Sequence, residues 1–240
     1  MKFFKVNMIV IFIVGVCFFS VWADDTGWKK IGESKGIVGY TRPTPKSSVD
    51  EMKGVGIIEA PVAVVEALIR DVPAATEYMY RCKEASVINT QEFKNTTDTM
   101  YTYNVISMPY PASDRDVVAK ADYSINKATG TVYVHAEGIK SGYKMDKKNV
   151  RMPLLIADYI LVPKGPDKTE VTYIALGDPG GNLPSFIINL FTKNLSIQTI
   201  AGIREMVKKD KYKNVKALVT TQIHLLPSLH APPESAKANF

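Results

Sequence analysis

The sequence predicts an α+β fold in which a curved antiparallel β-sheet wraps around one long C-terminal α-helix. Between residues 85 and 176, six segments with the composition of β-strands follow one another and are separated by turn-forming residues. After them, the segment 183–213 carries apolar residues at three- and four-residue steps. Its apolar stripe is broad, which is typical of a helix that the rest of the molecule covers. The sheet must therefore curve to bury this helix.

Two strands and a short helix are expected before these six segments. The strands cover residues 37–42 and 51–59 and are separated by a proline-rich turn. A helix then begins at Ala60-Pro61, because a proline in the first turn of a helix loses no hydrogen bond. Pro73 ends or kinks this helix. Its buried face is predicted from apolar residues at helical spacing, Val64, Val65, Leu68 and Ile69.

The six central segments are expected to pair as antiparallel strands. Turn-forming residues at 126–129 and 163–167 join consecutive segments. The sequence Asp-Pro-Gly-Gly-Asn at residues 178–182 stops the last of them. The six segments are residues 85–93, 99–108, 116–125, 130–139, 150–162 and 170–176.

The first residues have the organisation of a secretory signal peptide. Two lysines precede an uncharged run at residues 8–19, which is too short to span a bilayer, and small residues lead to a cleavage site after Ala23. We therefore expect residues 1–23 to be removed and the protein to be periplasmic or secreted, as suits a Gram-negative bacterium. Lipid attachment at Cys17 is the alternative, but it would need a small residue where Val16 stands.

The remaining chain is expected to form one domain at residues 24–213, followed by a loose tail at residues 214–240. Cys82 is its single cysteine. An exported chain with one cysteine has no internal disulfide, so its core must hold the fold together. We interpret Cys82 as a small buried hydrophobe.

Composition and charge exclude some classes of protein and of partner. Hydrophobic residues make up 46% and charged residues 22%, which excludes a disordered chain. The 30 Lys and Arg outnumber the 24 Asp and Glu only slightly, so nucleic acid is not expected as a partner. The dense basic stretches, residues 144–148 and 208–213, are interpreted as a solvated loop and a solvated helix end. Contact with an anionic membrane surface is the alternative.

Two motifs resemble a known protein family. Residues 109–116, Pro-Tyr-Pro-Ala-Ser-Asp-Arg-Asp, are similar to the PxPxSxRD signature of START domains, the StAR-related lipid transfer family. Residues 178–189 resemble the DPGG-x-[IL]-P-x-W sequence that leads into the last helix of that family. The resemblance covers residues 28–211. It implies a helix-grip fold with a tunnel for one lipid between the sheet and the C-terminal helix, whereas the residue pattern alone favours a fully packed core.

The motif residues themselves have structural explanations. Arg115 stands between two carboxylates, Asp114 and Asp116, and such an Arg can pin a loop through bidentate bonds. Contact with the ligand is the alternative. The second motif is interpreted as a turn whose glycines supply unusual backbone angles. Its residues are Asp178, Pro179, Gly180 and Gly181.

The resemblance also indicates polar residues that face the ligand. Polar cavity residues of the family fall on Asn104, His135 and Tyr173. Alternation along the strand places Tyr133 and Glu137 on the same face as His135. These side chains are either ligand contacts or satisfied polar groups of the core.

The strand at residues 101–106 gives two conflicting indications. Its alternation places the odd-numbered residues, which are aromatic or apolar, on the inward face. The resemblance places the even-numbered residues inward, and we follow it. These residues are Thr102, Asn104 and Ile106. A later strand and the last helix complete the predicted lipid-binding set with Ala157, Ile187, Phe191 and Leu195.

Departures from the family pattern indicate a weakly polar lipid. Phosphatidylcholine-binding members carry an Arg, which holds the phosphate, and an Asp after the first helix, where this chain has Ala75 and Met79. The positions of the buried acid–Arg pair of steroid-binding members fall near Thr102 and Ala121, so this pair is also absent here. Burying a phosphate without a cation is very costly. We therefore expect a sterol, a hopanoid or a fatty-acid-like lipid.

The sequence contains no familiar catalytic motif. It has 3 His and none of the HExxH, GxSxG, GxGxxG, Walker or CxxC patterns. We expect no enzymatic activity, no cofactor and no metal, and a monomer whose partners are a lipid and, transiently, a membrane surface. Two alternatives remain. One is a cyclase or aromatase that uses the tunnel with His135 and Glu137 as its general base; the other is a structural accessory protein of the cell envelope with a filled core.

Overall fold

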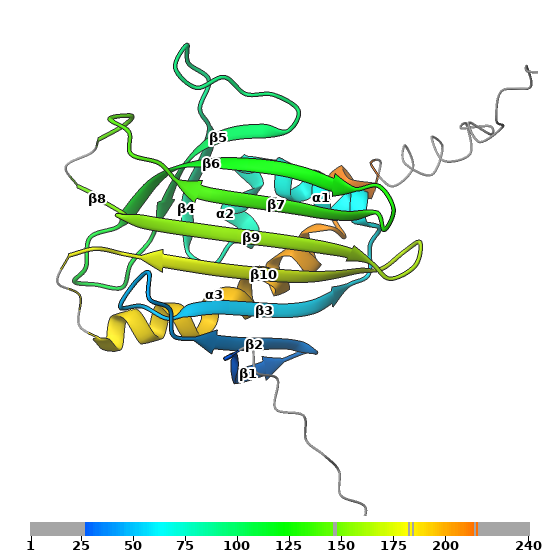
Figure 1. Cartoon of the computed structure of the whole chain (residues 1–240), viewed down its shortest axis with the longest axis horizontal. Helices are drawn as coiled ribbons and strands as arrows, with labels where there is room; N and C mark the ends of the chain where they lie inside the picture. Colours follow the sequence, from blue (N-terminus) through cyan, green and yellow to red (C-terminus); the bar gives the residue numbers. More distant parts are fainter. Residues whose placement is uncertain (1–26, 146–147, 182, 184, 214, 216–240) are drawn as a thin grey trace, which may run out of the picture.

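The computed structural model describes residues 27–145, 148–181, 183, 185–213 and 215. The predicted signal peptide and almost all of the predicted tail lie outside the described residues. A sheet of 10 strands wraps around α3, and α1 and α2 lie on the same side of the sheet (Figure 1). None of the described helices has the length and hydropathy of a membrane-spanning segment. The elements are β1 (Lys29–Ser34), β2 (Ile37–Arg42), β3 (Glu51–Ile58), α1 (Val62–Arg70), the 3-10 helix η1 (Val72–Ala74), α2 (Ala75–Tyr78), β4 (Cys82–Val87), β5 (Thr99–Ile106), β6 (Arg115–Asn126), β7 (Thr131–Gly138), β8 (Val150–Arg151), β9 (Leu154–Pro163), β10 (Thr169–Asp178) and α3 (Ser185–Met206).

The sheet is built from antiparallel neighbours in the order β1-β2-β3-β10-β9-β7-β6-β5-β4. The short β8 lies off this path and pairs in parallel with β6. The pairing of β3 with β10 joins the first strands of the chain to the last one. The predicted α+β fold with a sheet around a C-terminal helix is confirmed.

Several predicted boundaries differ from the structure. β1 is an additional strand, which the sequence did not indicate because its exposed residues show no alternation of polar and apolar side chains. The strand predicted at residues 85–93 begins and ends earlier, as β4. The strand predicted at residues 150–162 is interrupted, because Pro153 has no backbone N–H to donate between β8 and β9. α3 ends at Met206, before the predicted end of the helix.

The C-terminal half of α3 packs closely on its neighbours because glycines stand at the points of contact. A Cβ atom at Gly54 in β3 would lie 3.0 Å from the carbonyl oxygen of Ser196 in α3. On another side of α3, a Cβ atom at Gly202 would lie 2.3 Å from the carbonyl oxygen of Tyr78 in α2. Larger residues at these positions would push the helix away from the sheet or from α2.

Polar contacts hold the same half of α3. The backbone N–H of Tyr80 donates to Oγ1 of Thr199 at 3.2 Å. The guanidinium of Arg204 donates to the carbonyl oxygens of Lys35 and Ile57, at 2.8 and 2.9 Å. The helix is therefore attached both to the segment after α2 and to the first strands of the sheet.

A second, smaller core covers the outer face of β5. The loop after β4 covers the outer face of the sheet, and the ring of Phe93 packs against Tyr101 and Tyr143 with centroids 5.1 and 6.3 Å apart. The odd-numbered residues of β5 are thus buried outside the main core. The buried members of this cluster are Ile88, Phe93, Tyr103, Val105 and Val118.

Candidate ligand-binding cavity

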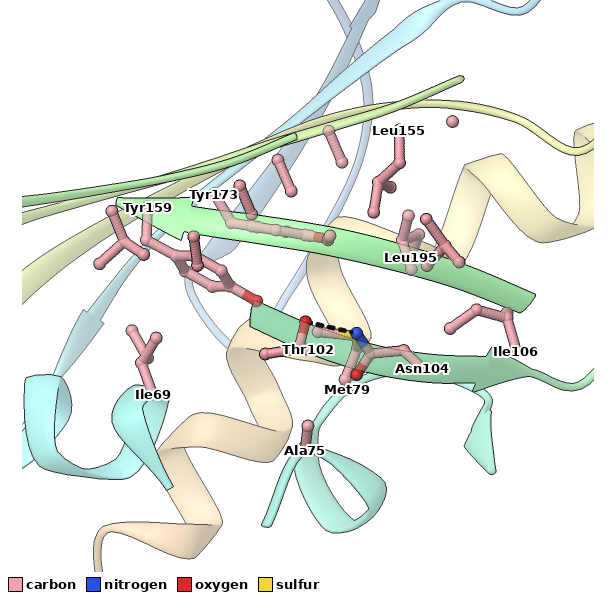
Figure 2. A pocket seen from close by; sticks show the side chains of 18 of the residues that line it. Ile69, Ala75, Met79, Thr102, Asn104, Ile106, Leu155, Tyr159, Tyr173 and Leu195 are labelled. Carbon is pink, nitrogen blue, oxygen red and sulfur yellow. Dashed lines mark hydrogen bonds between the residues drawn. The ribbon is translucent and has the colours of Figure 1, made fainter. Parts of the chain in front are cut away.

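A cavity of about 120 Å³ lies between the inner face of the sheet and the helices α1, α2 and α3 (Figure 2). This is about ten times the space that one water molecule needs. The side chains that line it come from six strands and from all the helical segments, and most of them are apolar. No charged side chain of the described residues belongs to its lining. Such a cavity suits an apolar ligand.

A row of alanines across the sheet leaves this space open. Four alanines stand in register on the adjacent strands β6, β7, β9 and β10: Ala121, Ala136, Ala157 and Ala175. The next rung of the same strands carries larger side chains, Tyr123, Val134, Tyr159 and Tyr173. Because methyl groups lie beside much larger side chains, the inner surface of the sheet forms a trough at the alanines.

The few polar groups in the lining are uncharged. Nδ2 of Asn104 donates to Oγ1 of Thr102 at 3.0 Å. The rings of Tyr159 and Tyr173 stack with centroids 4.6 Å apart and planes inclined by 28°. Burial raises the pKa of both phenols above the ordinary value, so both are protonated and neutral at physiological pH.

Six residues of the predicted lipid-binding set line the cavity. They come from β5, β9, β10 and α3 and are Thr102, Asn104, Ile106, Ala157, Tyr173 and Leu195. In β5 the even-numbered residues face inward, as the family resemblance indicated and as alternation alone did not. The side chains of Ile187 and Phe191 lie outside the described part of the molecule.

The prediction that Tyr133, His135 and Glu137 face the cavity is wrong. All three lie on the outer face of β7, where Tyr133 is 41% exposed and Nδ1 of His135 lies 2.6 Å from Oδ1 of Asp158. The inward face of β7 belongs to apolar residues, which include the buried Val134. Burying the apolar set of a strand and hydrating its polar set is the favourable arrangement, and it decides which face turns inward.

The positions where the resemblance places the Arg and the Asp of phosphatidylcholine-binding members are apolar here and belong to the cavity wall. They are Ala75 and Met79. Thr102 and Ala121, near which the acid–Arg pair of steroid-binding members falls, also line it. The wall therefore offers no ion pair and no cation at these positions.

Arg115 connects the two sequence motifs. Its side chain is buried, and its guanidinium donates to the carbonyl oxygens of Pro179 and Gly180, each at 2.9 Å, and to that of Ser113. Arg115 therefore pins the loop before α3 through backbone carbonyls, whereas the sequence predicted bonds to the neighbouring carboxylates. Oδ1 of Asp178 accepts from the N–H of Gly180 at 2.8 Å, and Gly180 and the following Gly181 have the positive φ expected of this turn.

Asp116 has a separate role on the other side of the sheet. Its carboxylate is buried, and Oδ1 accepts from Nε of Arg151 at 2.6 Å. Oδ2 accepts from the hydroxyl of Tyr103 at 3.1 Å. The motif residues from Arg115 to Asp116 and from Asp178 to Gly181 do not contribute side chains to the cavity lining.

Some lining residues were missed from the sequence. Tyr159 is two residues from the predicted Ala157 on the same strand, so alternation along β9 could have identified it. Tyr78 and Tyr123 also line the cavity, and no local pattern singled them out. Cys82, interpreted as a buried hydrophobe, is indeed buried.

Comparisons with known proteins agree with this architecture. The family model described as START domain matches residues 20–213. An uncharacterised protein of Pseudomonas aeruginosa is 32% identical over 182 residues, which is 76% of this chain and 87% of that protein. The phosphatidylcholine transfer protein of Mus musculus is 26% identical over 171 residues, which is 70% of this chain and 77% of that protein.

Solved structures show the same fold. A STAR-related lipid transfer protein of Xanthomonas axonopodis, fragment 25–204, has a TM-score of 0.68 and 27% identity, and the match covers 76% of this chain and 99% of that one. Human StAR-related lipid transfer protein 5 has a TM-score of 0.68 with 18% identity over 78% of this chain and 88% of its own. The match to the family model and the sequence identity to the bacterial relatives lead to one conclusion. The chain belongs to the START domain family.

Proposed function

We propose that this protein binds one weakly polar lipid in its cavity and carries it between membranes. The observation that carries the proposal is the cavity between sheet and helices, whose lining is apolar apart from neutral hydroxyl and amide groups. Burying about 400 Å² of apolar lipid surface there contributes on the order of 10 kcal/mol before the entropy costs of binding. This contribution offsets the cost of removing the lipid from the apolar interior of the membrane.

The composition of the cavity wall supports a sterol, a hopanoid or a fatty-acid-like lipid over a phospholipid. A buried phosphate needs a cation close to it. Ala75 and Met79 form the wall at the positions that correspond to the Arg and Asp of phosphatidylcholine-binding members. The relative named for phosphatidylcholine transfer therefore does not predict the ligand of this chain.

The place of action we propose is the periplasm or the outside of the cell. The support for it is the organisation of residues 1–23, a positive start followed by a short apolar run and a cleavage site. Transient contact with a membrane surface belongs to the same proposal, since a carrier must receive and deliver its lipid there. The lysines at residues 208–213 pair with acidic side chains of the protein itself, so their positive charge is partly neutralised.

The position of His135 weakens the cyclase alternative. A general base has to reach the substrate. His135 and Glu137 lie on the outer face of β7, away from the cavity. The accessory-protein alternative required a filled core, and the cavity argues against it. Binding and transport are therefore the activities that the geometry favours.

Native mass spectrometry of the protein purified from its own compartment tests this proposal. We expect one lipid per chain and, after extraction, a compound without a phosphate group. A transfer assay between donor and acceptor vesicles should then show catalysed movement of that lipid. A bound phospholipid would contradict the assignment of ligand class. An empty protein that also takes up no sterol, fatty acid or phospholipid would contradict the function.

A further inference from the structure

Tyr159 presents an unpaired polar group in the wall of the cavity. The residue is 5% exposed and belongs to the lining. Its phenol interacts with that of the stacked Tyr173, but its hydroxyl has no partner with hydrogen-bond geometry among the described residues. A buried hydroxyl without a partner is unfavourable, and buried polar side chains almost always have one. The cavity wall therefore offers a hydroxyl that no described side chain satisfies.

Two other tyrosine hydroxyls of the chain follow the usual rule. The hydroxyl of Tyr103 donates to Oδ2 of Asp116 at 3.1 Å, and that of Tyr212 donates to Oδ2 of Asp71 at 2.7 Å. Both lie outside the cavity lining. The unpaired hydroxyl of Tyr159 is thus associated with the cavity, where a ligand could complete its bonding.

The polar groups near Tyr159 are suited to a neutral partner. Figure 2 shows the ring of Tyr159 directed toward Thr102 and Asn104, whose side chains bond to each other at 3.0 Å. That bond uses one N–H of Asn104 and leaves its second N–H, its carbonyl oxygen and the hydroxyl hydrogen of Thr102. Burial raises the pKa of Tyr159, so its phenol is a neutral donor. Donors and acceptors are both present, and no charge accompanies them in the described lining.

The other end of the cavity has a different character. Ile106, Leu155 and Leu195 lie together there, away from Tyr159 (Figure 2). An elongated ligand with one polar end would match this division, with its apolar body against these side chains. An ionised carboxylate would find no cation in the described lining to offset the loss of its hydration.

We propose that Tyr159, together with Thr102 and Asn104, binds the single hydroxyl or carbonyl group of a neutral lipid. This inference rests on the proposed lipid-binding function and narrows it. An alcohol or ketone, such as a sterol, a hopanoid alcohol or a fatty alcohol, is the class of ligand; an ionised fatty acid is excluded.

Replacing Tyr159 by Phe removes only the hydroxyl. The lipid-free full-length protein is incubated with phosphatidylcholine vesicles that carry hexadecanol, hexadecane, hexadecanoate at pH 8, cholesterol or cholestane, and the loaded lipid is measured by mass spectrometry. We expect the unmodified protein to load each alcohol in preference to its hydrocarbon and to hexadecanoate. Tyr159→Phe should lower the affinity for the alcohols about tenfold, the equivalent of one neutral hydrogen bond, and leave the hydrocarbons unchanged.

The urea midpoint distinguishes a role of the Tyr159 hydroxyl in ligand recognition from a role in holding the fold together. Because the hydroxyl of Tyr159 is unpaired in the empty protein, Tyr159→Phe should leave the urea midpoint of the lipid-free protein unchanged or raise it. Tyr103→Phe is the matched control, since it removes a paired hydroxyl outside the cavity. This control should lower the midpoint and keep the preference for alcohols.

The outcomes distinguish this inference from the function on which it rests. If alcohols and hydrocarbons load equally, or if Tyr159→Phe loads alcohols as the unmodified protein does, the protein binds lipid but the recognition site is wrong. Preferential loading of hexadecanoate would overturn the ligand class. If no probe and no phospholipid loads, the proposed function and this inference both fail.

Discussion

At the scale of single residues, the surroundings of a side chain decide whether its chemistry is available. Burial raises the pKa of the Cys82 thiol to about 12, so the thiol does not ionise at physiological pH. His135 and Glu137 are accessible but lie on the face of the sheet that is turned away from the cavity. The cysteine is therefore unreactive, and the two residues that the cyclase alternative requires lie away from the cavity.

Thiol labelling measures the state of Cys82 directly. In a Cys17→Ser variant of the full chain, we expect a disulfide reagent to leave the native protein unmodified at both pH 7 and pH 9, because the Cys82 thiol is buried. Unfolding in guanidinium should expose the thiol to rapid reaction. Fast labelling of the native protein would show that Cys82 is more accessible than its burial indicates.

Asp71 links the end of α1 to the segment after α3, and its charge predicts a pH dependence. Burial alone would raise the pKa of Asp71, but bonds from Lys211 and Tyr212 lower it below its ordinary value overall. Because the pKa of Asp71 is lower in the folded than in the unfolded protein, its charge stabilises the fold at pH values above the unfolded-state pKa. This stabilisation is lost as the pH falls through the folded-state pKa. Asp71→Asn should therefore cost about 1–2 kcal/mol at pH 7 and progressively less below about pH 4.

Urea denaturation at several pH values measures this effect. Glu59→Gln serves as the control, because its carboxylate forms an exposed ion pair with Lys168. The control should change stability by less than about 1 kcal/mol. A cost for Asp71→Asn that does not shrink on acidification would mean that the carboxylate is not the stabilising group.

At the scale of elements, small residues in two places set the distances between layers. The alanine row leaves the trough in the sheet free of large side chains. Gly54 and Gly202, in contrast, allow α3 to pack closely on β3 and on α2. The first arrangement creates space and the second removes it. Both depend on residues that are far apart in the sequence.

Gly202→Ala tests the close contact between α3 and α2. The added Cβ would lie 2.3 Å from the carbonyl oxygen of Tyr78, and backbone atoms cannot move aside as a flexible side chain can. We expect a loss of about 2–3 kcal/mol in unfolding free energy. Gly142→Ala is the control, because no atom lies within 4 Å of the Cβ it would add, and it should be nearly neutral. Equal midpoints in urea for the two variants would contradict the packing described here.

At the scale of the whole molecule, the fold and, through the family resemblance, a cavity could be predicted, but the shape of the cavity wall could not. The broad stripe of the last helix and the turn signals between strands are local patterns, and the architecture follows from them. The trough depends on the register of Ala121 with Ala136 and Ala157, which strand pairing fixes and no local pattern reveals. The prediction for His135 is wrong because a position carried over from relatives does not take account of the alternation of buried and exposed residues along β7.

Filling the trough should abolish lipid binding without unfolding the protein. Ala121→Leu adds a large side chain to the inner face of β6, inside the cavity. We expect lipid loading to fall at least tenfold, while the urea midpoint is kept or raised because apolar surface fills empty space. Ser124→Leu on the exposed face of the same strand should leave loading unchanged. Normal loading of Ala121→Leu would show that the ligand lies elsewhere.

The close seating of α3 on Gly54 and Gly202 has a mechanical consequence. Side chains of α3 rest against the bare backbone of Gly54, and the bare backbone of α3 at Gly202 lies against Tyr78, so the helix cannot slide along its axis without collision. Arg204 attaches it to the first strands as well. We therefore expect this half of the helix to stay in place while a lipid enters or leaves. A disulfide that joins Ser196 or its neighbours to β3 should therefore leave the rate of lipid exchange unchanged. The part of the cavity wall that moves to admit a lipid is then expected outside this half of α3.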